Sequence, residues 1–262
     1  MDKTERIRKT AQSEEDAVLL AKVYDRITNG IRRQIPVSTF FLAPAQQRLV
    51  RSLLSGEDIR FFGGTAEPER AVCCWLPDYL DEDSLWDAEL SPICAVRATF
   101  YAADALTHRD FLGSLMGCGI KRETVGDIFV GQGSCDFLVT REILPYLLQN
   151  LESAGRTKLH LSRIPLEDIR TPQATIREIR TTVSSLRLDS VISAGFSLAR
   201  GKASDAIEAG RAVLNDLPVE KPDKAVSAGD KIALRGFGKI ILSEVGGKTR
   251  KDRLCIVISR YE

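Results

Sequence analysis

The residues of this sequence that could do chemistry are basic, and two of them stand where a helix is expected to begin. Arg200 and Lys202 occupy the first turn of a predicted helix that follows Ser197. A helix N-terminus carries partial positive charge and normally favours acidic residues in its first turn. A phosphate bound there would be held by free backbone N–H groups and by both side chains. The pattern predicts a phosphate site, with two solvated side chains on an exposed face as the alternative.

Two short helices are expected to position this charge. Apolar residues recur at i, i+3 and i+4 in two neighbouring segments, so each helix can turn one stripe toward a shared core. These residues are Leu188, Val191 and Ile192 in the first segment and Ala203, Ala206 and Ile207 in the second. We expect Gly195 to separate the two helices, Ser197 to cap the second and Gly210 to end it.

A small sheet is predicted after Gly210. Its strand-like segments are Ala212–Leu214, the residues around Val219, Ile232–Leu234 and Ile240–Leu242. Asn215 and Asp216 are expected to form the turn between the first two strands. The C-terminal third of the chain is therefore predicted to run helix, helix, small sheet.

A second basic group lies near the end of the sequence. Lys248, Arg250, Lys251 and Arg253 place four positive charges within six residues, at the tip of a predicted hairpin that continues into a strand over 254–259. Such charges could protect a sheet edge from aggregation or bind phosphate. We favour phosphate binding, on the expectation that no local acid neutralises the cluster.

Several catalytic motifs are imitated but fail on spacing. Residues 108–110, HRD, resemble the kinase catalytic loop, but Leu115 stands where that loop needs a metal-binding Asn. Residues 247–249, GKT, resemble the end of a P-loop, but Leu242 replaces its first glycine. The six cysteines include no CxxC pair and the chain has two histidines, so no zinc site is predicted. We expect a non-catalytic protein with reduced cysteines and no cofactor or metal.

Composition and charge fit a globular protein with more than one domain. The chain has 262 residues, of which 28% are charged and 44% hydrophobic. No apolar run reaches the roughly 18–20 residues of a membrane span, and the first ten residues are too charged for a secretory signal. We therefore expect a cytoplasmic location and no membrane partner. The net charge is only +1, but residues 187–262 carry 14 Lys and Arg against 10 Asp and Glu, which concentrates positive charge at this end.

The first ninety residues predict an α+β domain. Helices are expected at 13–30 and 44–54, and strands at 58–62 and 71–75. From residue 92 the predicted order is βαββαβ, the ferredoxin-like order. Its elements are a strand at 93–101, a helix at 108–118, hairpin strands at 127–130 and 137–140, a helix at 141–152 and a strand at 158–161. The third strand lacks the basic-glycine-aromatic signature of RNA-recognition domains, so the order alone indicates no function.

Residues 186–242 resemble the S4 domain, an RNA-binding module of a ribosomal protein, tyrosyl-tRNA synthetases and many pseudouridine synthases. The resemblance rests on Arg187-Leu188-Asp189, the segment Ala199 to Ala203, Ile207, Gly210, Asn215 and the segment Gly229 to Ile232. Ala199 departs from the pattern, because a Ser commonly precedes the Arg. The ATP signatures of the synthetases do not occur in this sequence. Pseudouridine synthases use an Asp in a GRLD-type segment of a separate catalytic domain, whereas the only RLD here, at 187–189, is already part of the S4-like segment.

Three further segments are similar to the YlmH family of bacterial S4-domain proteins. They are HRDFLGSLMGCGIKRETVGDI at 108–128, TVSSLRLD at 182–189 and GGKTRKDR at 246–253. The resemblance implies an RNA-binding protein associated with the large ribosomal subunit and with tRNA, acting in translation quality control. Members of the family are also linked to cell division.

These observations predict an α+β chain of three domains. We expect an N-terminal α+β domain at 1–91, a central ferredoxin-like domain at 92–165, a connecting segment at 166–180 and an S4-like domain at 181–262. The residues expected to bind RNA phosphates or to shape the binding surface are Arg187, Ser197, Arg200, Lys202, Arg211, Asn215, Arg235, Lys239, Lys248, Arg250, Lys251 and Arg253. Secondary candidates are His108, Arg109, Lys121 and Arg122.

The predicted function is non-catalytic binding of structured rRNA or tRNA through phosphate and shape contacts. One alternative is a protein-interaction factor of the cell-division machinery. Another is an RNA-modifying enzyme that uses the S4-like module for targeting. Salt dependence separates RNA binding from an apolar protein interface, because only phosphate contacts weaken steeply with ionic strength.

Overall fold

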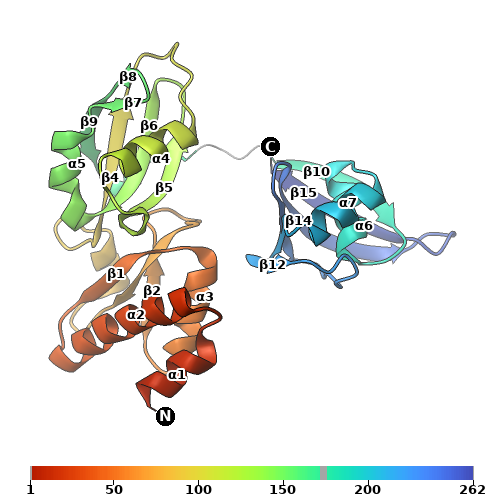
Figure 1. Ribbon diagram of the computed structural model, residues 1–262, viewed down its shortest axis with the longest axis horizontal. Helices are drawn as coiled ribbons and strands as arrows, with labels where there is room; N and C mark the ends of the chain where they lie inside the picture. The colour runs from red at the N-terminus through yellow and green to blue at the C-terminus, as the bar shows by residue number, and fades with distance from the viewer. Residues whose placement is uncertain (1, 172–175, 262) are drawn as a thin grey trace. The chain divides into compact units, whose positions relative to one another are not determined.

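The computed structural model describes residues 2–171 and 176–261. Contacts divide the chain into two compact units, Met1–Pro172 and Gln173–Glu262. Figure 1 shows the first unit in red to green and the second in teal to blue. Both units contain α-helices and β-strands, as the sequence predicts.

The first half of the first unit is a small sheet covered by three helices. The helices are α1 (Lys3–Thr10), α2 (Glu14–Arg33) and α3 (Pro44–Leu53), and the strands are β1 (Val37–Leu42), β2 (Ile59–Phe62) and β3 (Ala71–Trp75). The antiparallel strands lie in the order β1-β3-β2. One face of the sheet, which includes Leu42, Cys73 and Trp75, packs against α2 and α3 in a hydrophobic cluster.

The second half of the first unit has the predicted βαββαβ order of its main elements. These are β4 (Ile93–Thr99), α4 (His108–Gly117), β5 (Val125–Val130), β6 (Ser134–Thr140), α5 (Leu144–Asn150) and β9 (His160–Ile164). Short elements lie between and beside them: η1 (Glu82–Leu85), η2 (Arg122–Thr124), η3 (Arg141–Ile143), β7 (Ser153–Ala154), β8 (Thr157–Lys158) and η4 (Leu166–Asp168). The antiparallel sheet has the order β5-β6-β4-β9, and α4 and α5 bury one of its faces.

The two sheets of the first unit share a hydrophobic cluster and a polar joint. Phe41, Val72 and Cys74 of the first sheet pack against Ala95 and Leu138 of the second. Beside this cluster, one carboxylate of β5 accepts two backbone N–H bonds from the β2–β3 connection. The bonds join Asp127 to Glu69 at 2.8 Å and to Arg70 at 3.0 Å. The predicted N-terminal and central domains therefore form one compact unit.

Two elements near the N-terminus differ from the prediction. The helix α2 runs on to Arg33 instead of ending near Gly30, because the missing side chain of this buried glycine lets the helix lie directly against Val37 of β1. The left-handed residue that ends the helix is Gln34. Helix α1 and strand β1 were not predicted from their sequence patterns. Across residues 2–171 and 176–261, no helix has the length and apolar character needed to cross a membrane.

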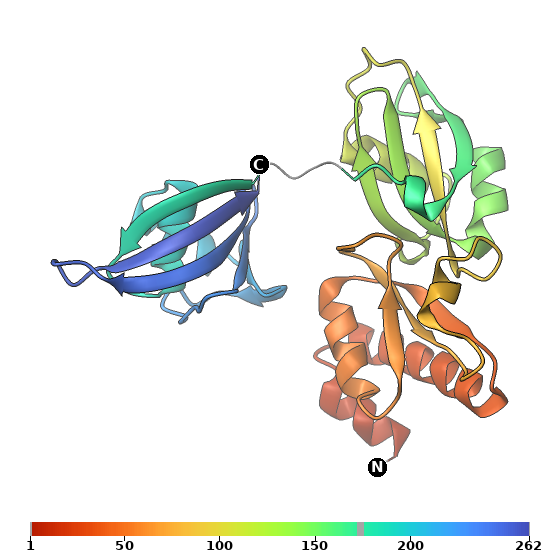
Figure 2. The same cartoon turned by 180° about the vertical axis from the view of Figure 1, so that it is seen from behind.

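The second unit is one six-stranded sheet with two helices on one face, visible from opposite sides in Figures 1 and 2. Its helices are α6 (Leu188–Phe196) and α7 (Arg200–Glu208), and its strands are β10 (Ile176–Val183), β11 (Ala212–Leu214), β12 (Leu217–Val219), β13 (Lys231–Leu234), β14 (Gly238–Lys248) and β15 (Leu254–Tyr261). The order is β10-β15-β14-β13-β11-β12. The sheet thus takes in β10, whose first five residues, 176–180, were expected in the connecting segment.

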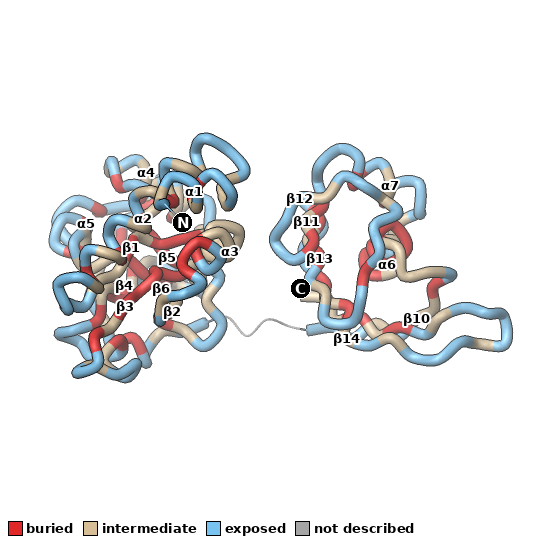
Figure 3. Tube along the Cα trace, turned by 90° about the horizontal axis from the view of Figure 1, so that it is seen from below, coloured by how far each residue is buried: buried red, intermediate tan, exposed pale blue. Residues whose placement is uncertain are grey.

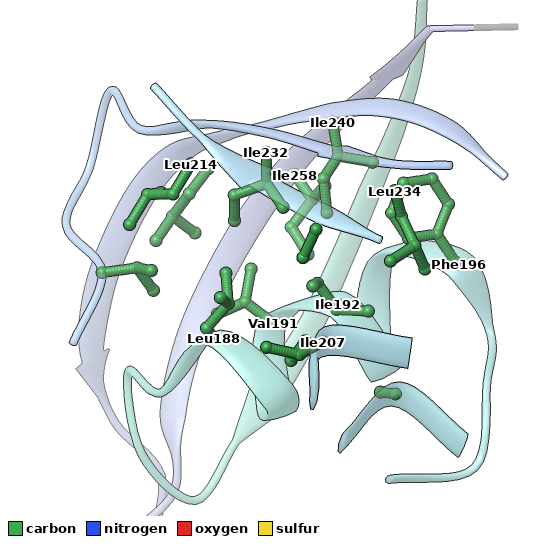
Figure 4. Close-up of a cluster of buried hydrophobic side chains, with 14 of the residues drawn as sticks. Leu188, Val191, Ile192, Phe196, Ile207, Leu214, Ile232, Leu234, Ile240 and Ile258 are labelled. Carbon is green, nitrogen blue, oxygen red and sulfur yellow. The ribbon is translucent and has the colours of Figure 1, made fainter. Parts of the chain in front are cut away.

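The predicted helix stripes form the core of the second unit. Leu188, Val191 and Ile192 of α6 and Ile207 of α7 lie against the inward residues of the sheet, as Figure 4 shows. Figure 3 shows buried segments in α6, β11 and β13. The i, i+3, i+4 spacing therefore places both helices on the sheet face that carries Ile232 and its neighbours.

The connection between the two helices corrects two predictions. Gly195 does not separate the helices but lies buried within α6, where an added Cβ would stand 2.6 Å from Ile240 Cδ1. Ser197 does not cap α7, because it is the left-handed residue, with φ of 53°, that ends α6. Its place is two residues before Ala199, which is the N-cap of α7 and makes no side-chain capping bond.

Gly126 in β5 offers a test of the joint within the first unit. A Cβ there would lie 2.6 Å from Phe41 Cε1 and 2.9 Å from Leu138 Cβ, both buried. We expect Gly126→Ala to lower the free energy of unfolding by about 1–3 kcal/mol through overpacking. The matched control is Gly113→Ala at an exposed position of α4, where a Cβ meets nothing within 4 Å. This change should stabilise the helix by about 0.5–1 kcal/mol.

Urea unfolding followed by tryptophan fluorescence measures both variants in the full chain. The chain's two tryptophans, Trp75 and Trp86, both lie in the first unit, so the signal reports this unit. Equal unfolding midpoints for the Gly126 variant and the unchanged chain would contradict the close packing at the joint.

Candidate nucleic-acid interface

Two of the predicted phosphate-binding residues, Arg187 and Arg200, meet at one buried carboxylate. Asp189 lies in the first turn of α6 with its side chain 5% exposed. It accepts bonds from Arg187 Nε and Nη2, both at 3.3 Å, and from Arg200 Nε at 3.0 Å. Ser190 Oγ donates a further bond at 3.2 Å. Asp189 thus links the beginning of α6 to the beginning of α7.

The pKa of Asp189 reflects opposing effects. Burial favours the neutral acid, but hydrogen bonds from Arg200 and Arg187 and the attraction of their charges outweigh it, so the pKa lies below its ordinary value. The carboxylate is therefore ionised at neutral pH. Asp189 stands in the Arg187-Leu188-Asp189 motif, but it was not among the predicted site residues. The signal that could have found it is an acid in a helix's first turn with basic residues near the starts of both helices.

The first turn of α7 keeps free groups that could bind an anion. Arg200, with its side chain 50% exposed, is bonded to Asp189 through Nε, and within the described residues its terminal amino groups have no other partner. Lys202, one half-turn further, is exposed and forms no ion pair or side-chain hydrogen bond with another described residue. Gly201 lies in open space. Because Ala199 provides no capping side chain, the first backbone N–H groups of α7 also remain available.

An aromatic ring that was not among the predicted site residues lies beside one of the basic candidates, Arg211. Arg211 Nη2 donates to the carbonyl of Arg235 at 2.7 Å, and the Arg211 guanidinium lies 5.7 Å from the ring centroid of Phe237. Phe237 is 37% exposed and lies 6.1 Å from the ring of Phe196 at the end of α6. The signal was present in the sequence, since Phe237 lies two residues from a basic residue on either side in the RGFGK segment.

Lys239 does not join these groups. Its neighbour Ile240 is fully buried under the helices, so the alternation of a strand places Lys239 on the opposite face of the sheet. There its ammonium lies 5.2 Å from the ring of Tyr261, the residue it pairs with on β15. Lys239 is thus separated by the sheet from Arg200 and Lys202.

The β14–β15 hairpin carries the predicted basic cluster at its tip, which projects beyond the sheet in Figure 1. Arg253 donates to the hydroxyl of Thr182 at 2.9 Å and to its carbonyl at 2.6 Å, which ties the tip to β10. Lys248 pairs with Asp252 at 2.7 Å. The expectation that no local acid neutralises the cluster was therefore wrong.

Two of the four hairpin cations remain available for binding. Within the part of the chain that the structure describes, Arg250 and Lys251 form no ion pair and no side-chain hydrogen bond, and both are exposed. Asn215 has a different role. With φ of 48°, it accepts a bond from the N–H of Lys231 at 2.9 Å and donates to Asp230 at 2.8 Å. Its amide thus fixes the β11–β12 turn.

The secondary candidates in the first unit lie at the two ends of α4. His108 and Arg109 are exposed in its first turn, whereas Lys121 and Arg122 follow its C-terminus. Because ten helical residues span about 15 Å, the two pairs do not form one site. Arg122 Nη1 donates to the carbonyl of Val125 at 2.6 Å, and burial lowers the pKa of its guanidinium. This side chain is mainly a structural part of the joint.

Comparison with known proteins identifies a second region. Residues 100–168, in the first unit, match a protein-family model described as a putative RNA-binding domain in YlmH. This segment begins directly after β4, ends with η4 and contains the secondary candidates. None of the twelve primary candidates lies within it.

Two individual proteins are similar to the chain. The ribosome-associated protein quality control protein P2 of Bacillus subtilis (strain 168) is 31% identical over 226 residues, which cover 86% of this chain and 87% of that protein. The structure of the cell division protein ylmH from Streptococcus pneumoniae matches with a TM-score of 0.49 and 24% identity, covering 61% of this chain and 98% of that one. Because the Bacillus protein aligns at this identity along most of both chains, and the YlmH domain model matches residues 100–168, the chain belongs to the YlmH family.

Proposed function

We propose that the protein binds structured RNA of the large ribosomal subunit, rRNA or tRNA, and acts in translation quality control without catalysis. The observation that carries this proposal is the first turn of α7. There Asp189 holds Arg200 in place through Nε, while the terminal amino groups of Arg200 and the side chain of Lys202 stay exposed. This set of donors fits a phosphate. The names of the matched family model and of the Bacillus relative support RNA and the ribosome as partners.

The second unit would contact RNA through its helix side and its hairpin. Arg187, Arg200 and Lys202 lie at the helix beginnings. Arg211 lies beside Phe237 and donates to the carbonyl of Arg235. Arg250 and Lys251 extend the positive surface at the hairpin tip. We assign Ser197, Asn215 and Arg253 supporting roles in the local structure, because their observed bonds or backbone angles hold turns and the hairpin. Lys239 faces away from this surface.

The domain division follows from the same proposal. We assign residues 1–165 to an N-terminal domain and a central ferredoxin-like domain joined in one unit, and residues from 176 onward to an S4-like RNA-binding domain. The sheet order β5-β6-β4-β9 and the pair of helices on one face of the second sheet support these assignments. A cytoplasmic location follows from the proposed ribosomal partner.

Salt titration of RNA binding tests the α7 site. We expect Arg200→Ala combined with Lys202→Ala to reduce the slope of log affinity against log salt by about one for each lost phosphate contact. Fluorescence anisotropy with large-subunit rRNA fragments measures the slope. The control is Lys231→Ala with Lys239→Ala, which removes the same charge from the opposite sheet face. Equal slopes for both double variants would remove the α7 site from the interface.

Sedimentation with purified large ribosomal subunits tests the partner. The unchanged protein should travel with the subunits at low salt, and the Arg200/Lys202 double variant should remain near the top of the gradient. A protein that stays at the top in both forms would count against stable ribosome binding.

Substitution of Asp189 shows whether this carboxylate orients Arg200 or only lowers the positive charge of the site. If Asp189 positions Arg200 for a phosphate, Asp189→Asn should weaken RNA binding by about tenfold, roughly one charge-assisted hydrogen bond, although the variant gains one positive charge. The control Asp205→Asn adds the same charge at an exposed position of α7, where Asp205 forms no ion pair or hydrogen bond with either arginine in the described structure. It should bind RNA equally well or more tightly. Tighter binding by both variants would show that Asp189 acts only as a negative charge.

A further inference from the structure

A polar surface pocket with one aromatic wall lies in the first unit, away from the residues discussed so far. It has a volume of about 330 Å³ and is formed where the end of β4 meets β8 and β9. Its lining residues are Thr99, Phe100, Tyr101, Asp104, Thr157, Lys158 and His160. Apart from Thr99, all lie inside the segment 100–168 that matches the putative RNA-binding domain.

Tyr101 is an exposed ring on a fixed backbone. Its neighbour Phe100 turns inward, with its ring 5.7 Å from Phe111 and its N–H bonded to the carbonyl of Gly133 at 3.0 Å. The carbonyl of Tyr101 accepts a bond from the N–H of Asp104 at 2.9 Å. The Tyr101 side chain is nevertheless 74% exposed, and within the described residues it makes no ring contact. A large aromatic surface held in water by an anchored backbone is available for stacking.

The polar groups around the ring are varied in charge. Thr99 and His160 are directly paired on neighbouring strands, so their side chains share the sheet face opposite α4 and α5. Lys158 provides a cation and Asp104 a carboxylate, and neither forms an ion pair among the residues that the structure describes. The pocket therefore offers an ammonium for a phosphate, and a carboxylate and hydroxyls for a base amino group or a ribose hydroxyl.

The combination fits one unpaired nucleotide better than a duplex. The volume is at the lower end of small-ligand sites, and a base inside a helix cannot expose its face to a protein ring. Aromatic stacking with a neighbouring cation is a common way of binding single-stranded nucleic acid. We propose that this pocket binds a single unpaired ribonucleotide, with its base stacked on Tyr101 and its phosphate at Lys158. The choice of RNA as ligand rests on the proposed function, but the pocket is formed by residues of the first unit alone.

Two RNA probes and the full chain test this assignment. The probes are a single-stranded oligoribonucleotide of about ten nucleotides and a blunt-ended RNA duplex, each measured by fluorescence anisotropy. We expect Tyr101→Ala to weaken single-strand binding by about five- to a hundredfold, the range for loss of one stacked base. Tyr101→Phe, which keeps the ring, should remain within about twofold. Lys158→Ala should lower the salt slope for this probe by about 0.7, the value for one single-strand phosphate.

A matched control is Tyr79→Ala, which removes another exposed tyrosine, 68% exposed, of the same unit outside the pocket. It should leave binding of both probes unchanged, and none of the tyrosine variants should alter duplex binding. Unchanged single-strand binding by Tyr101→Ala, or an equal loss with Tyr79→Ala, would overturn the assignment. Tryptophan fluorescence of each variant establishes that the first unit is folded.

The same experiment separates this inference from the proposed function. If the duplex is not bound while single-strand binding depends on Tyr101, the pocket stands and the proposed binding of structured RNA falls. If the duplex is bound through Arg200 and Lys202 while the single strand is bound without Tyr101, the pocket assignment falls alone. If neither probe is bound, both fall.

Discussion

The buried carboxylate of Asp189 is the constraint on which the second unit's basic surface depends. A carboxylate out of water is strongly destabilising unless charged partners compensate it, and removing one partner of such a group costs more than the pair contributes. Here Arg187 and Arg200 compensate it from two different helix beginnings. Because both arginines bond the same carboxylate, the first turn of α7 has a fixed orientation relative to α6. Because Arg200 uses its Nε for this bond, its terminal amino groups stay free, within the described residues, to bind an anion.

The remaining structure of the second unit supports this arrangement. Gly195 allows α6 to lie close to Ile240, and the aliphatic residues of both helices close the core on one face of the sheet. Arg253 ties the hairpin to β10 in the same way that Arg187 and Arg200 tie the helices. Several basic residues are thus used internally. A modest net charge is therefore compatible with a surface on which a few cations remain free and well positioned.

In the first unit, buried polar contacts hold two sheets together. Arg70 is half-buried at the joint, where it donates to the carbonyls of Phe41 and Val125, and burial lowers its pKa to about 10. Asp127 is held beside it by backbone N–H groups. This rigid joint supports the sheet whose far end carries the Tyr101 pocket. The region matched by the family model therefore has a stable frame and an exposed aromatic surface, which are the two requirements of a preorganised binding site.

The sequence by itself determined the local structure of most elements and the location of positive charge. Apolar spacing predicted α6 and α7, the left-handed residues Asn215 and Gly210 marked turns, and segment motifs indicated the family. These features depend on neighbours within about four residues, and so they can be read along the chain.

Only the tertiary structure decided which charges are free. Asp189 meets Arg200 across eleven positions and Arg253 meets Thr182 across seventy-one, and the sheet turns Lys239 away from both. Likewise, the sequence alone predicts a helix end at Gly195, whereas the structure shows that this glycine lies within α6 in close contact with Ile240. Long-range contacts carry no periodic signal, because they arise when separate elements pack, and this is why the set of free basic side chains could not be obtained from the sequence.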